Sequence, residues 1–232
     1  MDLGVLAVVV PLGPGERAWR GLVGALAPLP AVARVVLVAA DPADLPAADD
    51  PGLADLRAEV VTLTAPRGRA LQQNAGAAAA ERPYLWFLHA DCRLADSTLG
   101  ALAATMRAHP DALGYFDLRF AADGPAALRL NELGVLLRSR VLGLPFGDQG
   151  FFLSRGTFER LGGGDPTLPY GEDHALVWAA RRAGVPVVAA GAPLYTSARK
   201  YAAGGWLATT VRHVAHTAAQ AWREMSRPRG VA

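Results

Sequence analysis

The fold of this chain is decided at residues 84–91, which read Tyr84-Leu85-Trp86-Phe87-Leu88-His89-Ala90-Asp91. An apolar run of this length that ends on polar side chains predicts a strand buried on both faces of a parallel sheet. His89 and Asp91 then follow at the carboxyl end of the strand. Because open α/β sheets bind their ligands outside the carboxyl ends of the strands, we expect a functional site here.

Strand and helix patterns alternate on both sides of this run. In the first half, apolar runs predict strands at 6–10, 35–38, 60–63 and 85–88, each followed by a helical pattern, at 16–26, near 53, at 69–80 and at 97–109. Four such repeats predict a mostly parallel sheet flanked by helices. The second half predicts a half-exposed strand at 113–120, an amphipathic helix at 126–142, a short strand at 151–153, a helix from 172 to 183 and a buried strand at 185–189.

Composition limits the class of protein. A chain of 232 residues is long enough for one well-buried core and short for two domains. With 23 basic and 21 acidic residues the formal charge is +2, which gives no field to recruit nucleic acid. The single cysteine, Cys92, excludes an internal disulfide and fits a reduced setting. No apolar stretch approaches the roughly 18 residues needed to span a bilayer. We expect a cytoplasmic protein, with peripheral membrane attachment left open.

Two further groups of polar residues have the composition of a site. Glu172 and Asp173 follow Gly171 at a predicted helix start, and Asp148 and Gln149 lie between two glycines. Glycine on both sides lets the backbone approach a ligand closely. Each group also has a plain alternative: carboxylates at a helix start compensate the helix dipole, and the glycine-flanked pair is compatible with an ordinary tight turn.

More motifs accompany these groups. They are Arg67-Gly68-Arg69 with Gln73-Asn74-Ala75-Gly76, Asn131-Glu132-Leu133-Gly134, Arg138-Ser139-Arg140, and Thr196-Ser197-Ala198-Arg199-Lys200. In this order and spacing, over most of the chain, the motifs resemble family 2 glycosyltransferases. They are most similar to a small bacterial subgroup associated with radical-SAM and selenium-domain proteins, or with arsenosugar synthesis. The resemblance implies a GT-A fold, an α/β single domain with a Rossmann-like, mostly parallel sheet. We expect a nucleotide-binding half at about 1–93, an acceptor half at about 94–200 and a C-terminal helix at about 201–232.

The resemblance also implies a reaction. Members move a sugar, typically a hexosyl group, from a nucleotide-sugar donor to an acceptor with inversion, and a divalent metal neutralises the leaving diphosphate. Asp91 is the implied metal ligand. His89 stands where most of the family has a first aspartate, which removes one hard ligand and predicts weaker or manganese-preferring binding of the ion, Mn²⁺ or Mg²⁺. Asp173 is the implied catalytic base and Glu172 its neighbour in acceptor binding.

The remaining implied residues bind substrate. Asp148 and Gln149 are expected at the sugar or the acceptor. Donors to the base or the diphosphate are expected from two segments, namely Arg67, Arg69 and Asn74 after the third strand, and Ser197, Arg199 and Lys200 near the carboxyl end. The acceptor is either a small molecule or lipid-linked. Cys92 is expected to be a buried filler, and His174 either assists at the site or packs in its helix.

Two departures from the family keep other functions open. After the first strand the chain reads Pro11-Leu12-Gly13-Pro14-Gly15-Glu16 where the family has Pro-x-x-Asn-Glu. After the second strand, Asp41 stands near the family's nucleotide-binding aspartate in a shifted register. The alternatives are a nucleotidyltransferase, although no glycine-rich phosphate loop with lysine lies near the start, and a catalytically degenerate nucleotide-sugar-binding protein. In the C-terminal helix, an apolar stripe between 206 and 222 favours packing on the domain or a homodimer over contact with an anionic membrane.

Overall fold

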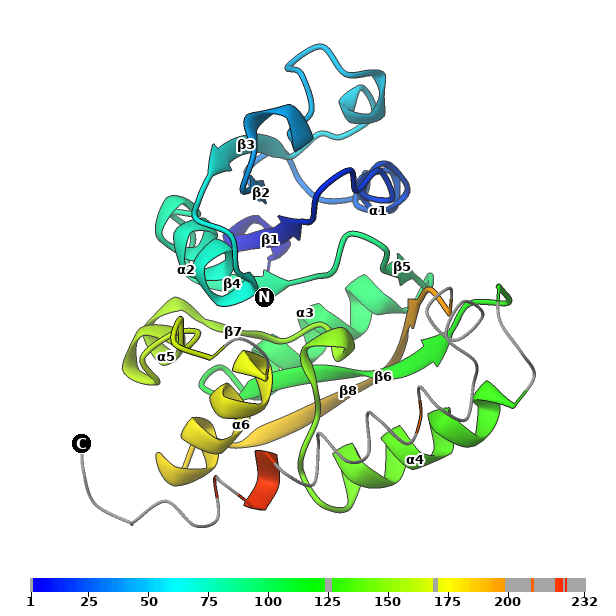
Figure 1. Cartoon of the computed structure of the whole chain (residues 1–232), viewed down its shortest axis with the longest axis vertical. Coiled ribbons are helices and arrows are strands. Elements are labelled where there is room, and N and C mark those ends of the chain that lie inside the picture. The colour runs from blue at the N-terminus through cyan, green and yellow to red at the C-terminus, as the bar shows by residue number, and fades with distance from the viewer. Residues whose placement is uncertain are drawn as a thin grey trace.

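In the part of the chain that the structure describes, the sheet has eight strands in the order β3-β2-β1-β4-β7-β6-β8-β5. The structure is a computed structural model that describes residues 2–123, 127–168, 171–198, 210, 220–222 and 224. Figure 1 shows β1 to β3 in the upper part of the molecule and β6 and β8 in the lower part, with α4 along the lower edge.

The first half of the sheet is parallel. Its strands are β1 (Leu6–Leu12), β2 (Arg34–Ala39), β3 (Glu59–Thr64) and β4 (Tyr84–Phe87). β1 pairs with β2 and β4, and β2 pairs with β3, all in parallel. The helices of this half are α1 (Trp19–Ala25) and α2 (Arg69–Ala79), with short 3₁₀ turns at Leu3–Val5, Pro42–Asp44 (η2) and Pro51–Leu53. The predicted elements of this half are confirmed, with boundaries that move by a few residues at most.

The second half of the sheet is mixed. Its strands are β5 (Arg93–Leu94), β6 (Leu113–Phe120), β7 (Phe152–Ser154) and β8 (Val187–Thr196). β7 lies antiparallel to both β4 and β6, β6 pairs with β8 in parallel, and β5 pairs with β8 antiparallel. Around it lie α3 (Thr98–Ala108), α4 (Leu128–Arg140), α5 (Arg155–Arg160), α6 (Glu172–Arg182) and the 3₁₀ turn η4 (Gly147–Gln149).

Helices cover both faces of the sheet because successive residues of each strand point to opposite sides. Val8 and Val10 of β1 pack with the core that includes Trp19 of α1 and Leu102 of α3. Val9, between them, packs with the other core, which includes Val177 of α6 together with residues of α2 and α5. Two buried layers on one sheet confirm the predicted α/β single domain.

The sequence pattern missed α5 and β5 and shortened β8. α5 and β5 have too few residues to produce a period, and β8 continues to Thr196 rather than ending at 189. β5 matters for the site because it pairs Arg93 with Tyr195. This pairing brings the segment after Asp91 beside the carboxyl end of β8.

Most of the predicted C-terminal helix lies outside the described residues, as do Arg199 and Lys200. The few described residues of this segment contact the domain itself. Asn131 Nδ2 donates to Thr210 Oγ1 at 3.0 Å, and Arg182 pairs with Glu224 at 2.8 Å. These contacts support packing on the protein's own domain. In the part of the chain that the structure describes, no helix has the length and apolar character to cross a membrane.

Candidate active site

The two glycine-marked motifs of the second half meet through Asp173. Gly171, at φ 83°, precedes α6, so Asp173 lies in the first turn of that helix. Its Oδ2 accepts a hydrogen bond of 2.6 Å from the Gly147 N–H, and its Oδ1 accepts one of 2.8 Å from the His174 N–H. A Cβ on Gly147 would lie 3.0 Å from Asp173, so this approach depends on glycine. The bonds fix the carboxylate of Asp173 against η4.

Gln149 holds the other end of the same turn. Its side chain is fully buried, and Nε2 donates to the Phe116 carbonyl of β6 at 2.9 Å. Its Oε1 accepts from the Phe146 N–H at 3.1 Å and from Arg138 at 3.2 Å. Because both the nitrogen and the oxygen of this amide are already hydrogen-bonded within the protein, the amide does not suit the predicted direct contact with a sugar. Gln149 thus holds the turn that carries the half-buried Asp148.

A cleft of about 490 Å³ opens beside the acidic pair. It is lined by the start of α2, from Arg67 to Leu71, by 166–168 and by Gly171 and Glu172. Across it, Arg69 Nη1 lies 3.4 Å from Glu172 Oε1. Burial, together with the charge of Asp173, raises the pKa of Glu172, and Arg69 opposes that rise. The structure therefore brings Arg67 and Arg69 to the same cleft as Glu172.

Asp91 follows the carboxyl end of β4. The charges of Asp91, Asp148 and Arg69 all act on the buried thiol of Cys92, so the three groups lie within electrostatic range of it. Burial first, and then Asp91, raises the pKa of Cys92. A thiol that stays protonated is no nucleophile, which confirms Cys92 as a buried filler. His89 lies half-buried at the same strand end.

The described residues alone do not form a closed metal site. Among the residues that the structure describes, no group of three or more histidine, cysteine, aspartate or glutamate side chains is placed to hold an ion. Asp91 does fit a shared site, because Mg²⁺ and similar hard cations commonly bind one or two carboxylates together with substrate phosphates.

Asn74 differs from its predicted role. Its Nδ2 donates to the Gly164 carbonyl and its Oδ1 accepts from the Gly164 N–H, both at 2.8 Å. A Cβ on the neighbouring Gly163 would lie 2.9 Å from Asn74 Oδ1, and Gly163 has a φ of 70°. Asn74 thus holds the glycine-rich turn against α2 instead of facing a nucleotide. Asn74 therefore acts on the site indirectly, by holding the turn that leads into the cleft.

Ser197 has a partner that the sequence analysis did not identify. Its hydroxyl donates to Asp123 Oδ2 at 2.8 Å, and the Ala198 N–H donates to Oδ1 at 2.9 Å. Burial works to raise the pKa of Asp123, but these two hydrogen bonds lower it overall. Asp123 follows β6 and lies 74 residues from Ser197, and no local pattern links the two.

The ends of β1 and β2 are held by local contacts. Glu16 accepts from the Ala18 N–H at 2.7 Å, and the exposed Asp41 accepts from the Ala43 N–H at 2.9 Å as the N-cap of η2. Asp44 joins the two loops by accepting from the Gly15 N–H at 2.7 Å. The use of Asp41 by a nucleotide stays a prediction.

His174 is buried and follows Asp173 in the first turn of α6. Burial lowers its pKa, while Asp173 acts in the opposite direction and Arg138 acts with burial. Its ring lies edge-on to Phe146, with centroids 5.3 Å apart, and its Nε2 lies 3.4 Å from the Trp178 Nε1 donor. A neutral, packed imidazole favours the packing role over an assisting one.

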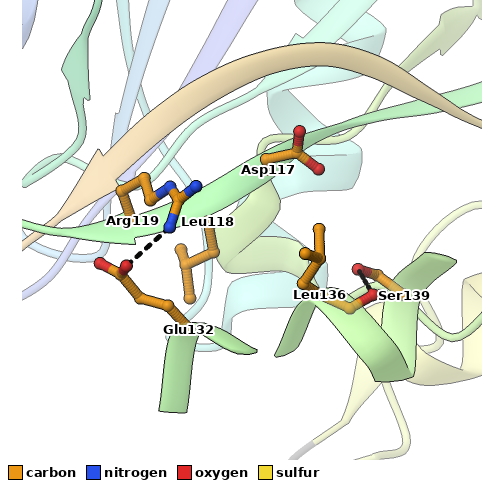
Figure 2. Close-up of a pocket in the computed structure, with 6 residues that line it drawn as sticks. All are labelled: Asp117, Leu118, Arg119, Glu132, Leu136 and Ser139. Carbon is orange, nitrogen blue, oxygen red and sulfur yellow. Dashed lines mark hydrogen bonds and ion pairs between the residues drawn. The ribbon is translucent and has the colours of Figure 1, made fainter. Parts of the chain in front are cut away.

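The motifs of α4 attach that helix to β6. Glu132 accepts from the Phe120 N–H and from Arg119, each at 2.8 Å, and the Tyr115 hydroxyl donates to the Ser139 carbonyl at 3.0 Å. Figure 2 shows Glu132 and Ser139 of α4 with Arg119 of β6 around a small cavity. At about 10 Å³ the cavity has room for one water at most. These motif residues are therefore structural, and the open cleft at α6 is the candidate site.

The sheet is half parallel and flanked by helices, carboxylates lie at the end of β4 and at the start of α6, and an open cleft lies beside them. These features together define the GT-A class of folds. The chain belongs to glycosyl transferase family 2, whose model matches residues 46–162. The match includes Asp91 and 147–150, whereas Glu172 and Asp173 lie beyond it. A search of curated proteins found no match.

Solved structures confirm the fold. TarS of S. aureus, residues 1–349 in complex with UDP-GlcNAc, matches with a TM-score of 0.60 at 18% identity, over 85% of this chain and 58% of that chain. GalNAc-T7 with UDP, GalNAc and Mn²⁺ matches with a TM-score of 0.62 at 15% identity, over 83% of this chain and 43% of that one. The present chain thus spans little more than half the length of the solved TarS chain.

Proposed function

We propose that this protein transfers a sugar from a nucleoside-diphosphate sugar to an acceptor hydroxyl, with inversion and with a divalent cation. The observation that carries the proposal is Asp173, a carboxylate fixed by the Gly147 N–H at 2.6 Å beside a cleft of about 490 Å³. A base must be positioned before it can deprotonate an acceptor, and these bonds position it.

In the proposed reaction, Asp173 takes the proton of the acceptor hydroxyl. The acceptor oxygen bonds to the anomeric carbon on one side while the bond to the phosphate oxygen breaks on the other, which inverts the carbon. The nucleoside diphosphate leaves with the electron pair of the broken bond. Each oxygen of Asp173 already accepts one backbone hydrogen bond, and a carboxylate oxygen has a further lone pair for the proton.

The diphosphate is proposed to lie between Arg69 and Asp91. The side chain of Arg69 is 42% exposed and its contact with Glu172 is long, so the guanidinium is available to a phosphate. Asp91 would hold Mn²⁺ or Mg²⁺ together with the phosphates, and the cation would offset charge on the leaving group. His89 is proposed as a neighbour of this ion. Arg199 and Lys200 stay proposed as donors that close over the diphosphate, whereas the Ser197 hydroxyl already donates its one proton to Asp123.

We also propose that the two halves of the chain have separate roles. Residues 1–93 would bind the nucleotide and residues 94–200 the acceptor. TarS was solved with UDP-GlcNAc and GalNAc-T7 with UDP, so uridine diphosphate sugars are the first donors to test.

Donor hydrolysis tests this function without a known acceptor. Wild-type protein with Mn²⁺ and UDP-sugars should release UDP slowly, because water replaces the acceptor. Asp173→Asn should reduce the rate by about two to four orders of magnitude and leave donor affinity nearly unchanged. Asp111→Asn, an exposed aspartate before β6, is the matched control and should keep full activity.

The same assay separates the alternatives. Binding of nucleotide sugars with no turnover of any donor or acceptor would replace the proposal with a binding protein. Thermal stabilisation by nucleoside triphosphates alone would favour a nucleotidyltransferase, because ligands stabilise the state that binds them. Full activity in Asp173→Asn would remove Asp173 as the base.

A further inference from the structure

Arg138, in the last turn of α4, lies against the turn that holds Asp173. The last turn of α4 has two basic residues, Arg138 and Arg140, and a basic side chain there offsets the helix dipole. The two arginines have different partners. Arg140 is exposed and pairs with Asp117 of β6 at 2.7 Å. Arg138 is half-buried and faces residues 146–149. The helix dipole alone does not explain why Arg138 is turned inward.

Arg138 contacts both ends of this turn. Its guanidinium carbon lies 3.4 Å from the ring centroid of Phe146, which is a stacked cation–π arrangement. Its Nη2 donates to Gln149 Oε1 at 3.2 Å, and the same oxygen accepts from the Phe146 N–H at 3.1 Å. A planar guanidinium can stack through its face and donate through its edge at the same time, which a lysine ammonium cannot do. The arginine side chain therefore fits this place in a way that a simple positive charge does not.

Between the two ends of the turn lies the N–H that holds Asp173. Gly147 follows Phe146, and its N–H donates to Asp173 Oδ2 at 2.6 Å. The direction of this N–H is set by the peptide plane that joins Phe146 to Gly147. A turn that shifts therefore moves the hydrogen bond that orients the carboxylate, and catalytic groups tolerate little misplacement.

The aromatic side of the contact continues into α6 itself. The ring of Phe146 lies edge-on to that of His174, with centroids 5.3 Å apart, and His174 lies edge-on to Trp178 at 6.2 Å. His174 directly follows Asp173 in the first turn of α6. Arg138 thus reaches the helix of the proposed base by two routes, through the backbone of the turn and through the Phe146 ring.

We propose that Arg138 is a positioning residue for the sugar transfer, which holds residues 146–149 and, through them, the carboxylate of Asp173. The effect of Arg138 on the reaction rate rests on the proposed function. Its hold on Asp173 can be measured without turnover. The proposal also gives α4 a role in the site, because the last turn of this helix carries the side chain that fixes the turn.

Nuclear magnetic resonance of the isotope-labelled full chain tests the hold on Asp173. An amide proton in a short hydrogen bond to a carboxylate resonates at low field, so the Gly147 signal should lie downfield in the wild type and move upfield in Asp173→Asn. Arg138→Met removes both contacts with the turn and should move the signal in the same direction. Arg140→Met is the matched control, because it removes an arginine of the same helix turn that faces β6, and should leave the signal in place. An unchanged Gly147 signal in Arg138→Met would overturn the proposal.

Donor hydrolysis with Mn²⁺ and UDP-sugars measures the effect on rate. Arg138→Met should lower kcat by roughly ten- to a hundredfold and change KM for the donor by less than about twofold, because a misplaced base acts after the donor is bound. Arg138→Lys keeps the charge and a donor but loses the stack, so its kcat should lie between those of the wild type and Arg138→Met. Arg140→Met should keep the wild-type rate. Circular dichroism checks that each variant is folded, and Arg138→Lys carries both measurements if Arg138→Met does not fold.

A second substitution shows whether Arg138 acts through Asp173. In the Asp173→Asn background, Arg138→Met should lower the remaining rate by less than about twofold, because the group that it positions is already gone. Equal rate losses in Arg138→Met and Arg140→Met would overturn the proposal, and so would a full further loss in the Asp173→Asn background. A wild type that hydrolyses no donor would remove the proposed transfer, while the Gly147 signal would still decide whether Arg138 holds Asp173.

Discussion

Two groups of carboxylates in this protein, one after the strands β1 and β2 and one at the start of α6, are held in different ways. Glu16 and Asp41, after β1 and β2, each bond a backbone N–H two residues further on. Asp173 is held by Gly147, 26 residues away, and Glu172 faces Arg69 on another helix. The first group stabilises its own loops. The second group is fixed by distant parts of the chain, which is what an active site requires of its charged groups.

The comparison predicts that substitutions in the second region act over long distances. The largest expected effect on stability is at Gln149. Gln149→Leu would leave the Phe116 carbonyl, the Phe146 N–H and Arg138 without this partner in a buried place. We expect a loss of about 3 kcal/mol in the free energy of unfolding, measured by urea denaturation. Gln73→Leu, half-buried on α2, serves as control. Equal losses in both variants would contradict the special position of Gln149.

The next largest effect is expected at Asp91. Asp91→Asn removes a charge from the proposed cation ligand, so affinity for UDP in the presence of Mn²⁺ should fall by about tenfold or more. Affinity without metal should stay nearly the same. Calorimetric titration with and without Mn²⁺ measures both values. A variant with unchanged metal dependence would exclude Asp91 as the ligand.

The effect of Glu172 on stability should depend on pH. Its pKa in the folded protein is raised, so the folded state binds the proton more tightly than the unfolded state does. The associated stability is present below the unfolded pKa of about 4.3 and is lost as pH rises through the folded pKa. Glu172→Gln, which mimics the protonated acid, should therefore exceed the wild type in melting temperature at pH 7, and the difference should shrink toward pH 4. A variant less stable than wild type at pH 7 would mean that the pair with Arg69 outweighs burial.

The smallest effect is expected in the first region. Asp41→Ala removes the cap of a three-residue 3₁₀ turn, which should cost about 1 kcal/mol or less. Nucleotide affinity, measured by the same titration, should change by less than about twofold, because the side chain serves its own loop. A loss of more than about tenfold would instead show that Asp41 recognises the nucleotide, and the contrast between the two regions would fail.

The positions of the strands were largely predictable from the sequence, whereas the pairing of each strand with its neighbours was only partly predictable. β6 begins and ends where the pattern places it, since alternation records which face of a strand is buried. β5 has two residues and exists only because Tyr195 and Leu194 lie opposite it. The antiparallel insertion of β7 between β4 and β6 also leaves no mark in a local pattern.

The site residues, too, were only partly predictable from the sequence. Asp173, Arg69 and Glu172 were each expected at the site, and the structure shows contacts from Asp173 to Gly147 and from Arg69 to Glu172. Asn74 and Gln149 were expected at a ligand, yet their partners are the backbone of Gly164 and of Phe116. An amide is equally suited to a sugar hydroxyl and to a peptide group, so residue type alone could not decide.

The sequence by itself determined the alternating layers, the buried strand that leads to Asp91, and the glycine-marked turns, because burial period and backbone freedom are local properties. Only the tertiary structure decided which polar groups are engaged by the protein and which face the cleft. It also decided that the leucines of α4 point away from the sheet. The outcome depends on which distant segment lies opposite each side chain, since a hydrogen bond or a buried contact forms only when both partners are brought within reach.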